Sequence, residues 1–116
     1  MRHNPPVMTA TWEEFERLRL TVGRIVDVQE FAEARVPAWK LTIDFGEHGV
    51  RRSSAQITRY PGEDLLGRQV VCVLGFEPKR IAGFESEVLV LGAMTEDLGV
   101  VLLRPDRDVA DGTPVA

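Results

Sequence analysis

The chain has 116 residues and an apolar share of 44%, which suits one globular domain with a core of its own. The net charge of −4 argues against strong non-specific binding to nucleic acids, and the single cysteine excludes an internal disulfide. Apolar runs stay short of the roughly 18 residues that a membrane span needs, and the N-terminus does not read as a signal peptide. We therefore expect a cytoplasmic protein without membrane insertion.

The N-terminal part predicts an arm and a short helix. Residues 1–10 are polar with two prolines, so we expect a flexible arm before a single domain at 11–116. Thr11 and Glu14 have the spacing of a capping box, and apolar residues then recur at helical spacing over 12–18. Seven residues do not form a stable helix alone, so this helix must dock on the domain or on a partner chain.

The next part of the chain predicts three strands. Residues 20–30 alternate imperfectly between apolar and polar, and Gly23 would allow a bend or bulge there. A second strand over 39–45 has its apolar residues on one face. A hairpin connection with two glycines, 46–49, leads to a third strand at 50–55.

The remaining elements complete a barrel pattern. We expect one or two helical turns over 57–67, strands at 69–76, 87–93 and 100–103, and a loop over 77–83 between the first two of these. The order fits an all-β OB-fold, a five-stranded barrel with a short N-terminal helix, a short helical segment after the third strand and a C-terminal strand extension. The binding face of an OB-fold usually comprises its second and third strands and the flanking loops.

The cations of the chain are concentrated in one block. Residues 51–80 hold six basic and three acidic side chains, whereas the parts before and after are net acidic. Because this block includes the third strand and the loop after the fourth, we expect a basic face there. An exposed turn is the alternative for Lys79-Arg80.

Catalytic and metal-binding patterns are weak in this sequence. His3 lies in the predicted arm and His48 in a turn, and neither has a cysteine or histidine at ligand spacing. The glycine-rich motifs that hold nucleotide phosphates are missing from the sequence. We therefore expect neither enzymatic activity, nor a metal, nor a cofactor.

Two polar stretches are the candidate binding surface, and they are expected to share one face. Ser53, Ser54, Gln56 and Thr58 alternate donors and acceptors beside arginines, although hydroxyls at a strand end also cap the helical turn that follows. The second stretch runs over 79–87. Its Phe84 is either a stacking platform for a base or a core side chain, and spacing alone does not decide between them.

The chain closely resembles the CsaA export-chaperone family, a stand-alone form of the tRNA-binding domain appended to methionyl- and phenylalanyl-tRNA synthetases. The resemblance covers about residues 12–115. Its motifs are F-x-x-L-x-L-x-V-G-R-I at 15–25, A-R-V-P-A-x-K-L-x-I-D-F-G at 34–46, S-S-A-Q-I-T at 53–58 and P-K-R-I-A-G-F-x-S-E-V-L-V-L-G at 78–92.

The resemblance implies a homodimeric OB-fold without enzymatic activity, with dimer contacts from the N-terminal helix and the C-terminal strand extension. It implies two ligands for one face: unfolded or presecretory polypeptides, and tRNA recognised by shape. A folding or assembly module that binds another protein is the third interpretation. Relatives often carry Asn where this chain has Gly75, and Glu77 adds a negative charge; both weaken the tRNA interpretation.

The predicted binding residues combine the basic block with the positions that match the motifs. They are Arg51, Arg52, Ser53, Gln56, Thr58, Lys79, Arg80, Phe84, Ser86 and Glu87.

Overall fold

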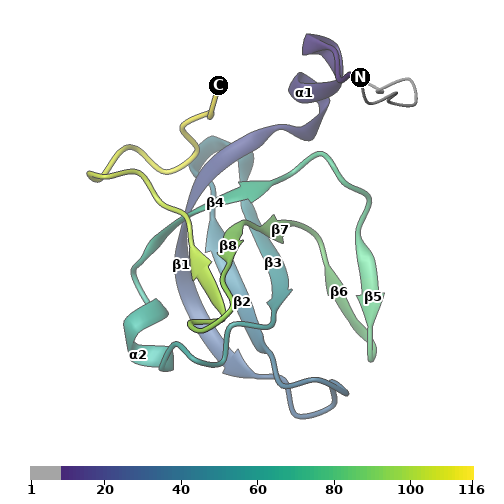
Figure 1. The fold of residues 1–116 in the computed structure, drawn as a ribbon, viewed down its shortest axis with the longest axis vertical. Coiled ribbons are helices and arrows are strands. Elements are labelled where there is room, and N and C mark those ends of the chain that lie inside the picture. Colours follow the sequence, from purple (N-terminus) through teal and green to yellow (C-terminus); the bar gives the residue numbers. More distant parts are fainter. Residues whose placement is uncertain (1–8) are drawn as a thin grey trace, which may run out of the picture.

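The computed structural model describes residues 9–116, so the predicted arm at 1–10 lies almost wholly outside the described residues. The elements follow the expected order (Figure 1). They are α1 (Trp12–Leu18), β1 (Leu20–Glu30), β2 (Trp39–Asp44), the 3₁₀ turn η1 (Gly46–His48), β3 (Val50–Ala55), α2 (Gly62–Leu65), β4 (Gln69–Val73), β5 (Lys79–Ile81), β6 (Phe84–Ser86), β7 (Leu89–Val90), β8 (Gly92–Met94) and β9 (Val100–Leu102).

The barrel is built from one antiparallel sheet with the strand order β3-β2-β1-β4-β7. Its two edges meet where the chain just before β7 crosses β3, so the sheet is almost closed. The core fills the interior with one face of each strand, including Ile25, Leu41, Ile43, Phe45 and Val70. The OB-fold class expected from the sequence is confirmed.

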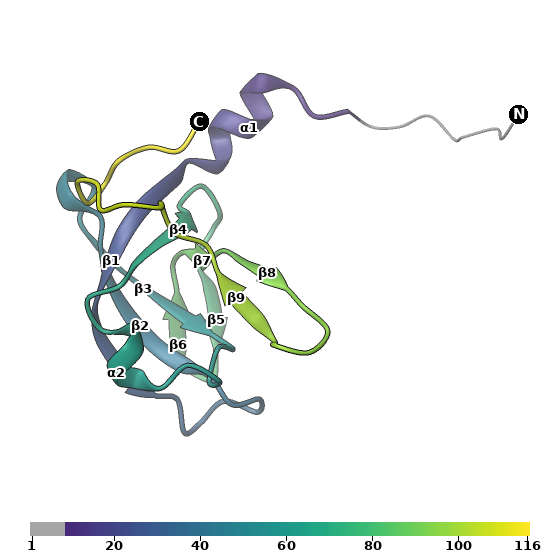
Figure 2. The same ribbon diagram turned by 60° about the vertical axis from the view of Figure 1, so that its left-hand side comes forward.

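Helix α1 begins as predicted. The Thr11 hydroxyl accepts a hydrogen bond from the Glu14 amide at 3.1 Å, and the Thr11 amide donates to the Glu14 carboxylate at 2.9 Å. Such caps typically contribute about 1 kcal/mol. None of the residues of α1 is buried, and the helix lies at one end of the barrel (Figure 2).

The role predicted for Gly23 is wrong in part. The bulge in β1 lies further along, between Ile25 and Asp27, where the pairing with β2 shifts. A β-carbon at Gly23 would lie 2.5 Å from the Phe45 ring and 2.6 Å from a methyl group of Ile43. Close packing inside the barrel therefore requires a glycine at position 23.

The region predicted as a loop at 77–83 and a strand at 87–93 is organised differently. Residues 79–86 form a hairpin, β5–β6, around a two-residue turn in which Ala82 and Gly83 both have positive φ. The later strand is divided because Leu89 and Val90 pair with β4, whereas residues 92–94 pair with β9.

The strand predicted over 69–76 ends early, at Val73. The next two amides donate to the end of α1 instead: Leu74 to the Arg19 carbonyl and Gly75 to the Leu18 carbonyl. A β-carbon at Gly75 would overlap the Arg17 carbonyl oxygen. The sequence interpretation placed Gly75 beside the binding loop, and the structure adds that the C-terminal end of α1 docks on the Gly75 backbone.

The C-terminal segment runs back along β1. The amides of Val22 and Val115 donate to the carbonyls of Thr113 and Leu20, each at 2.9 Å. Arg24 forms ion pairs with Asp108 and Asp111, both at 3.3 Å, and fixes this segment to the barrel. Among the described helices, none is long and apolar enough to cross a membrane.

Candidate binding groove on the outer face of the barrel

The alternation of β3 divides the predicted residues between the two faces of the sheet. Ser53 lies opposite Leu41 and is only 1% exposed, so it belongs to the interior. Arg51 shares that side and donates to the His48 carbonyl at 3.4 Å. Arg52 and Ser54 point to the outer face, where Ser54 lies opposite Lys40.

The β5–β6 hairpin has two faces as well. Its register pairs Lys79 with Ser86 and Ile81 with Phe84, so these four side chains share one face. Arg80 and Glu85 are paired on the opposite face and form an exposed ion pair at 3.7 Å. Of the two adjacent cations, Lys79 is therefore the one on the Ser86 side of the hairpin.

The two predicted stretches are brought side by side, as expected. The Ser54 amide donates to the Ser86 hydroxyl at 3.0 Å, and the Arg52 amide donates to the Glu87 carboxylate at 3.0 Å. The Ser53 hydroxyl donates to the Val88 carbonyl at 2.8 Å. Ser53, Ser86 and Glu87 thus close the seam of the barrel, which is a structural use of three side chains that we expected to contact a ligand.

A groove follows this seam and is formed by two neighbouring cavities that share Ser54 and Ile81. Their volumes are about 330 and 370 Å³. The first is lined by Ala34, Arg35, Val36, Ala38, Ser54, Gln56, Ile81 and Ala82. The second is lined by Ser54, Phe76, Glu77, Lys79, Ile81, Ser86, Glu87, Val88 and Leu89.

Apolar side chains are exposed along the groove. Val36 is 51% exposed, Phe76 50% and Leu89 48%. Ser54 lies between the two cavities, and charges of both signs lie on the walls. We call these two cavities together the binding groove.

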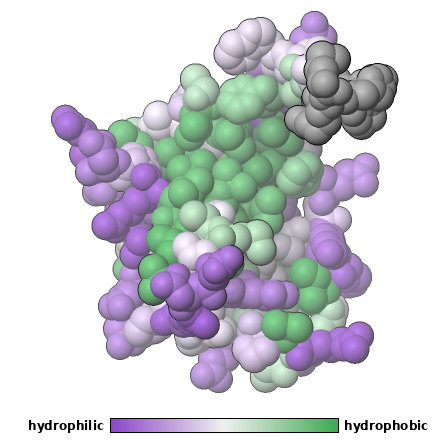
Figure 3. All heavy atoms as spheres, viewed as in Figure 1, coloured by the Kyte–Doolittle hydropathy of each residue, from purple (hydrophilic) through white to green (hydrophobic). Residues whose placement is uncertain are grey.

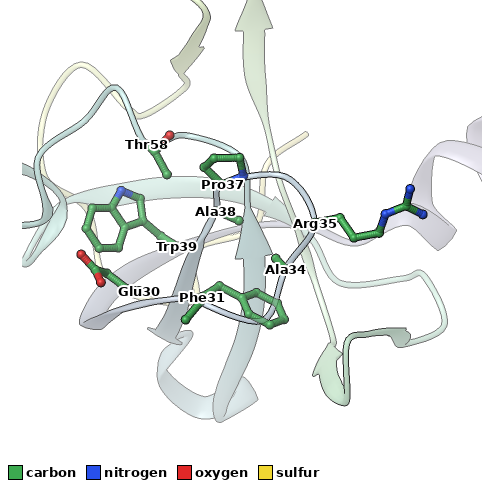
Figure 4. Close-up of a pocket in the computed structure, with 9 residues that line it drawn as sticks. Glu30, Phe31, Ala34, Arg35, Pro37, Ala38, Trp39 and Thr58 are labelled. Atoms are coloured by element: carbon green, nitrogen blue, oxygen red, sulfur yellow. The ribbon is translucent and has the colours of Figure 1, made fainter.

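A third cavity lies on the other side of the loop that forms the first wall of the groove. It has a volume of about 480 Å³, and Figure 4 shows Trp39, Phe31, Pro37 and Thr58 around it. The Trp39 indole donates to the Tyr60 carbonyl at 3.1 Å and is held in place by that bond. Thr58 therefore lines this third cavity and is not part of the lining of the binding groove.

Phe84 is 5% exposed, so the structure shows the buried one of its two predicted alternatives. It packs with Phe31 and Ala38 in a small cluster of its own, separate from the barrel core. Sequence reasoning missed the partners of this cluster, because a loop residue such as Phe31 shows no periodicity that marks it as buried.

The predicted basic block does not form a single face. Arg52 and Lys79 lie beside the groove, but Arg59 donates to the Asp97 carbonyl at 2.7 Å. The Arg68 guanidinium lies 5.1 Å from the centre of the Tyr60 ring. Adjacency in sequence does not determine the face, because strand alternation and the α2 segment direct these cations to different sides.

Within residues 9–116, no group of three or more His, Cys, Asp or Glu side chains is arranged to hold a metal ion. Cys72 lies in the core, where burial raises the pKa of its thiol to about 12. A thiol with that pKa is a poor nucleophile near neutral pH.

A small OB-fold barrel with a groove beside its third strand is the architecture of a binding domain. Residues 20–114 match the family model described as "Putative tRNA binding domain". The structure superimposes on the chaperone CsaA of Bacillus anthracis with a TM-score of 0.87 at 53% identity, covering 94% of this chain and 100% of that one. For the CsaA chaperone of Picrophilus torridus the TM-score is 0.88 at 46% identity, covering 93% and 100%.

The chain belongs to the tRNA-binding domain family, and within it to the CsaA branch that the sequence motifs indicated. Among curated proteins it is similar to the methionine–tRNA ligase of Thermococcus onnurineus, 37% identical over 105 residues. That match covers 90% of this chain but 14% of the ligase, so the chain spans about a seventh of the length of the curated relatives.

Proposed function

We propose that the protein is a non-catalytic, CsaA-like chaperone that holds extended segments of unfolded or export-bound polypeptides in the binding groove. The observation that carries this proposal is the exposure of Val36, Phe76 and Leu89 along a groove that also offers polar groups. Extended chains present alternating side chains and a continuous row of backbone groups, and such a groove accepts them with little dependence on sequence.

The charges around the groove support a polypeptide ligand. Arg35 and Lys79 are accompanied by Glu77 and Glu87, so the lining is mixed in sign. A polyphosphate backbone is repelled by the carboxylates, whereas a polypeptide offers both charges. The net charge of −4 also repels a polyphosphate backbone at long range.

The test uses fluorescein-labelled, reduced and carboxymethylated α-lactalbumin, a permanently unfolded chain. Changing Phe76 and Leu89 together to Ser is expected to weaken its binding, measured by fluorescence anisotropy, about tenfold or more. Leu66→Ser is the matched control, since Leu66 is 57% exposed but lies outside both the groove and the β8–β9 hairpin. Equal binding by wild type and the Phe76/Leu89 variant would show that the groove is not the polypeptide-binding site.

Binding of tRNA by the same face is the second candidate, and the family match favours it. Arg52 and Lys79 would contact phosphates beside the groove. In that case the affinity for tRNA falls steeply with salt, and an Arg52→Gln, Lys79→Gln double variant shows a shallower slope. Excess tRNA should also displace the labelled polypeptide. Failure to do so would show that tRNA and polypeptide bind at different sites.

We further propose that the protein acts as a cytoplasmic homodimer. Helix α1 has no buried residue, and Trp12 at its start is 79% exposed. Figure 3 shows a broad hydrophobic area on the face that carries the β8–β9 hairpin, where Met94 is 90% exposed. Apolar areas of this kind mark contact surfaces, and a second copy of the chain would cover both.

A further inference from the structure

The two walls of the binding groove are joined beneath its surface by one aromatic contact. Phe31 begins the loop that supplies the first wall, and Phe84 begins β6 of the hairpin that supplies the second. Their ring centres are 5.3 Å apart with a tilt of 58°, and the rings are 4% and 5% exposed. Tilted aromatic pairs at this separation stabilise a structure beyond the effect of the area that they bury.

Two cations from the sheet hold this aromatic pair in place. The Lys40 ammonium lies 4.9 Å from the centre of the Phe31 ring and 5.5 Å from that of Phe84. The Arg52 guanidinium lies 4.2 Å from the centre of the Phe84 ring. Lys40 also forms an ion pair with Glu33 at 3.9 Å, which ties the loop to β2. We call Phe31, Phe84, Lys40 and Arg52 the aromatic clip.

The clip is connected directly to the lining of the groove. Ala34 and Ile81 pack against the cluster that contains Phe31 and Phe84, and both also line the first cavity. Ile81 lies directly opposite Phe84 in the hairpin, so a shift of one moves the other. The contact between Phe31 and Phe84 therefore joins the two walls of the groove.

We propose that Phe31 and Phe84 are positioning residues that fix the width of the groove for an extended polypeptide, and that Phe84 does not touch the ligand. This inference rests on the proposed function. A groove whose walls are held before binding avoids the cost of ordering them, and loosening the clip restores that cost.

The test compares Phe31→Leu, Phe84→Leu and the double variant, with reduced, carboxymethylated α-lactalbumin as the probe. Each single change is expected to weaken binding about three- to tenfold. The double variant is expected to bind no more weakly than the single variant with the larger loss, because either change breaks the same contact. Amides of residues 79–86 should exchange hydrogen faster in all three, and saturating probe should restore their protection. Ile57→Val, a change in the separate barrel core, should lower stability without changing affinity.

Three results would contradict the proposal that Phe31 and Phe84 fix the width of the groove. Loss of affinity in Phe84→Leu but not in Phe31→Leu would make Phe84 a direct contact. Losses that add in the double variant would mean that the two rings act independently. Unchanged affinity in both single variants, while the Phe76/Leu89 variant binds weakly, would reject the clip and leave the proposed function standing. If the Phe76/Leu89 variant also binds normally, the proposed function fails.

Discussion

At the scale of single residues, three polar side chains hold the seam of the barrel closed. Ser53 and Ser54 were correctly placed on the third strand, but alternation directs Ser53 to the interior and Ser54 to the exterior. The hydroxyl of Ser53 and the side chains of Ser86 and Glu87 replace backbone partners along the barrel seam. That use depends on a register between segments more than 30 residues apart, which no local pattern contains.

The clearest backbone strain among the described residues near the groove is at Ala82, with φ of 48° in the β5–β6 turn. Such turns favour Asn followed by Gly, because both central residues need positive φ. Ala82→Asn is expected to raise the free energy of unfolding by about 0.5–1 kcal/mol.

Urea denaturation measures this change. Ala32→Asn is the control, since Ala32 is also exposed in a loop and its φ is not positive. A loss of stability in Ala82→Asn, or an equal gain in Ala32→Asn, would contradict the account of the turn.

At the scale of elements, the helix and the first three strands could be predicted within a residue or two, because their signals are local. The T-x-x-E cap, the apolar alternation of 39–45 and the paired glycines of 46–49 act within a few residues. The division of 87–94 between β7 and β8 could not be predicted from its apolar run. There, pairing with β4 on one side and β9 on the other breaks a stretch that looks continuous in sequence.

The docking of α1 depends on Gly75. Gly75→Ala is expected to displace the end of the helix, since the added carbon overlaps the Arg17 carbonyl and weakens the hydrogen bond from the Gly75 amide to Leu18. We expect a loss of about 1–3 kcal/mol in the free energy of unfolding and faster hydrogen exchange at residues 15–18.

Gly62→Ala is the matched control for that substitution, because a β-carbon there meets its nearest neighbour, the Trp39 ring, at an ordinary 3.7 Å. If Gly75→Ala leaves the hydrogen exchange of α1 unchanged, the helix is held by contacts other than those with the Gly75 backbone.

At the scale of the whole molecule, the barrel could be predicted from the order of its elements, whereas the groove could not. The groove exists because the loop after β1 and the β5–β6 hairpin meet over β3, and their meeting point is a pair of rings 53 positions apart. Exposed apolar surface on the β8–β9 face was likewise hidden in runs that looked like interior strands.

The proposed dimer makes a prediction at this scale. Trp12→Ser combined with Met94→Asp should convert a dimer into a monomer, as measured by size exclusion with light scattering at micromolar concentration, because these exposed apolar side chains lie on the proposed contact surface. Phe76→Ser is the control, since Phe76 is exposed in the binding groove instead. A wild-type monomer under these conditions would reject the dimer.

The C-terminal segment along β1 has a consequence for synthesis. Leu20 and Val22 bond to residues 112–115, so the first strand completes its pairing with a segment that is made roughly 90 residues later. At about 5–20 residues per second, a ribosome leaves this part of β1 uncovered for roughly 5–20 seconds. During that interval, the nascent chain itself exposes an unpaired strand edge, which is the kind of extended segment that the finished protein is proposed to hold.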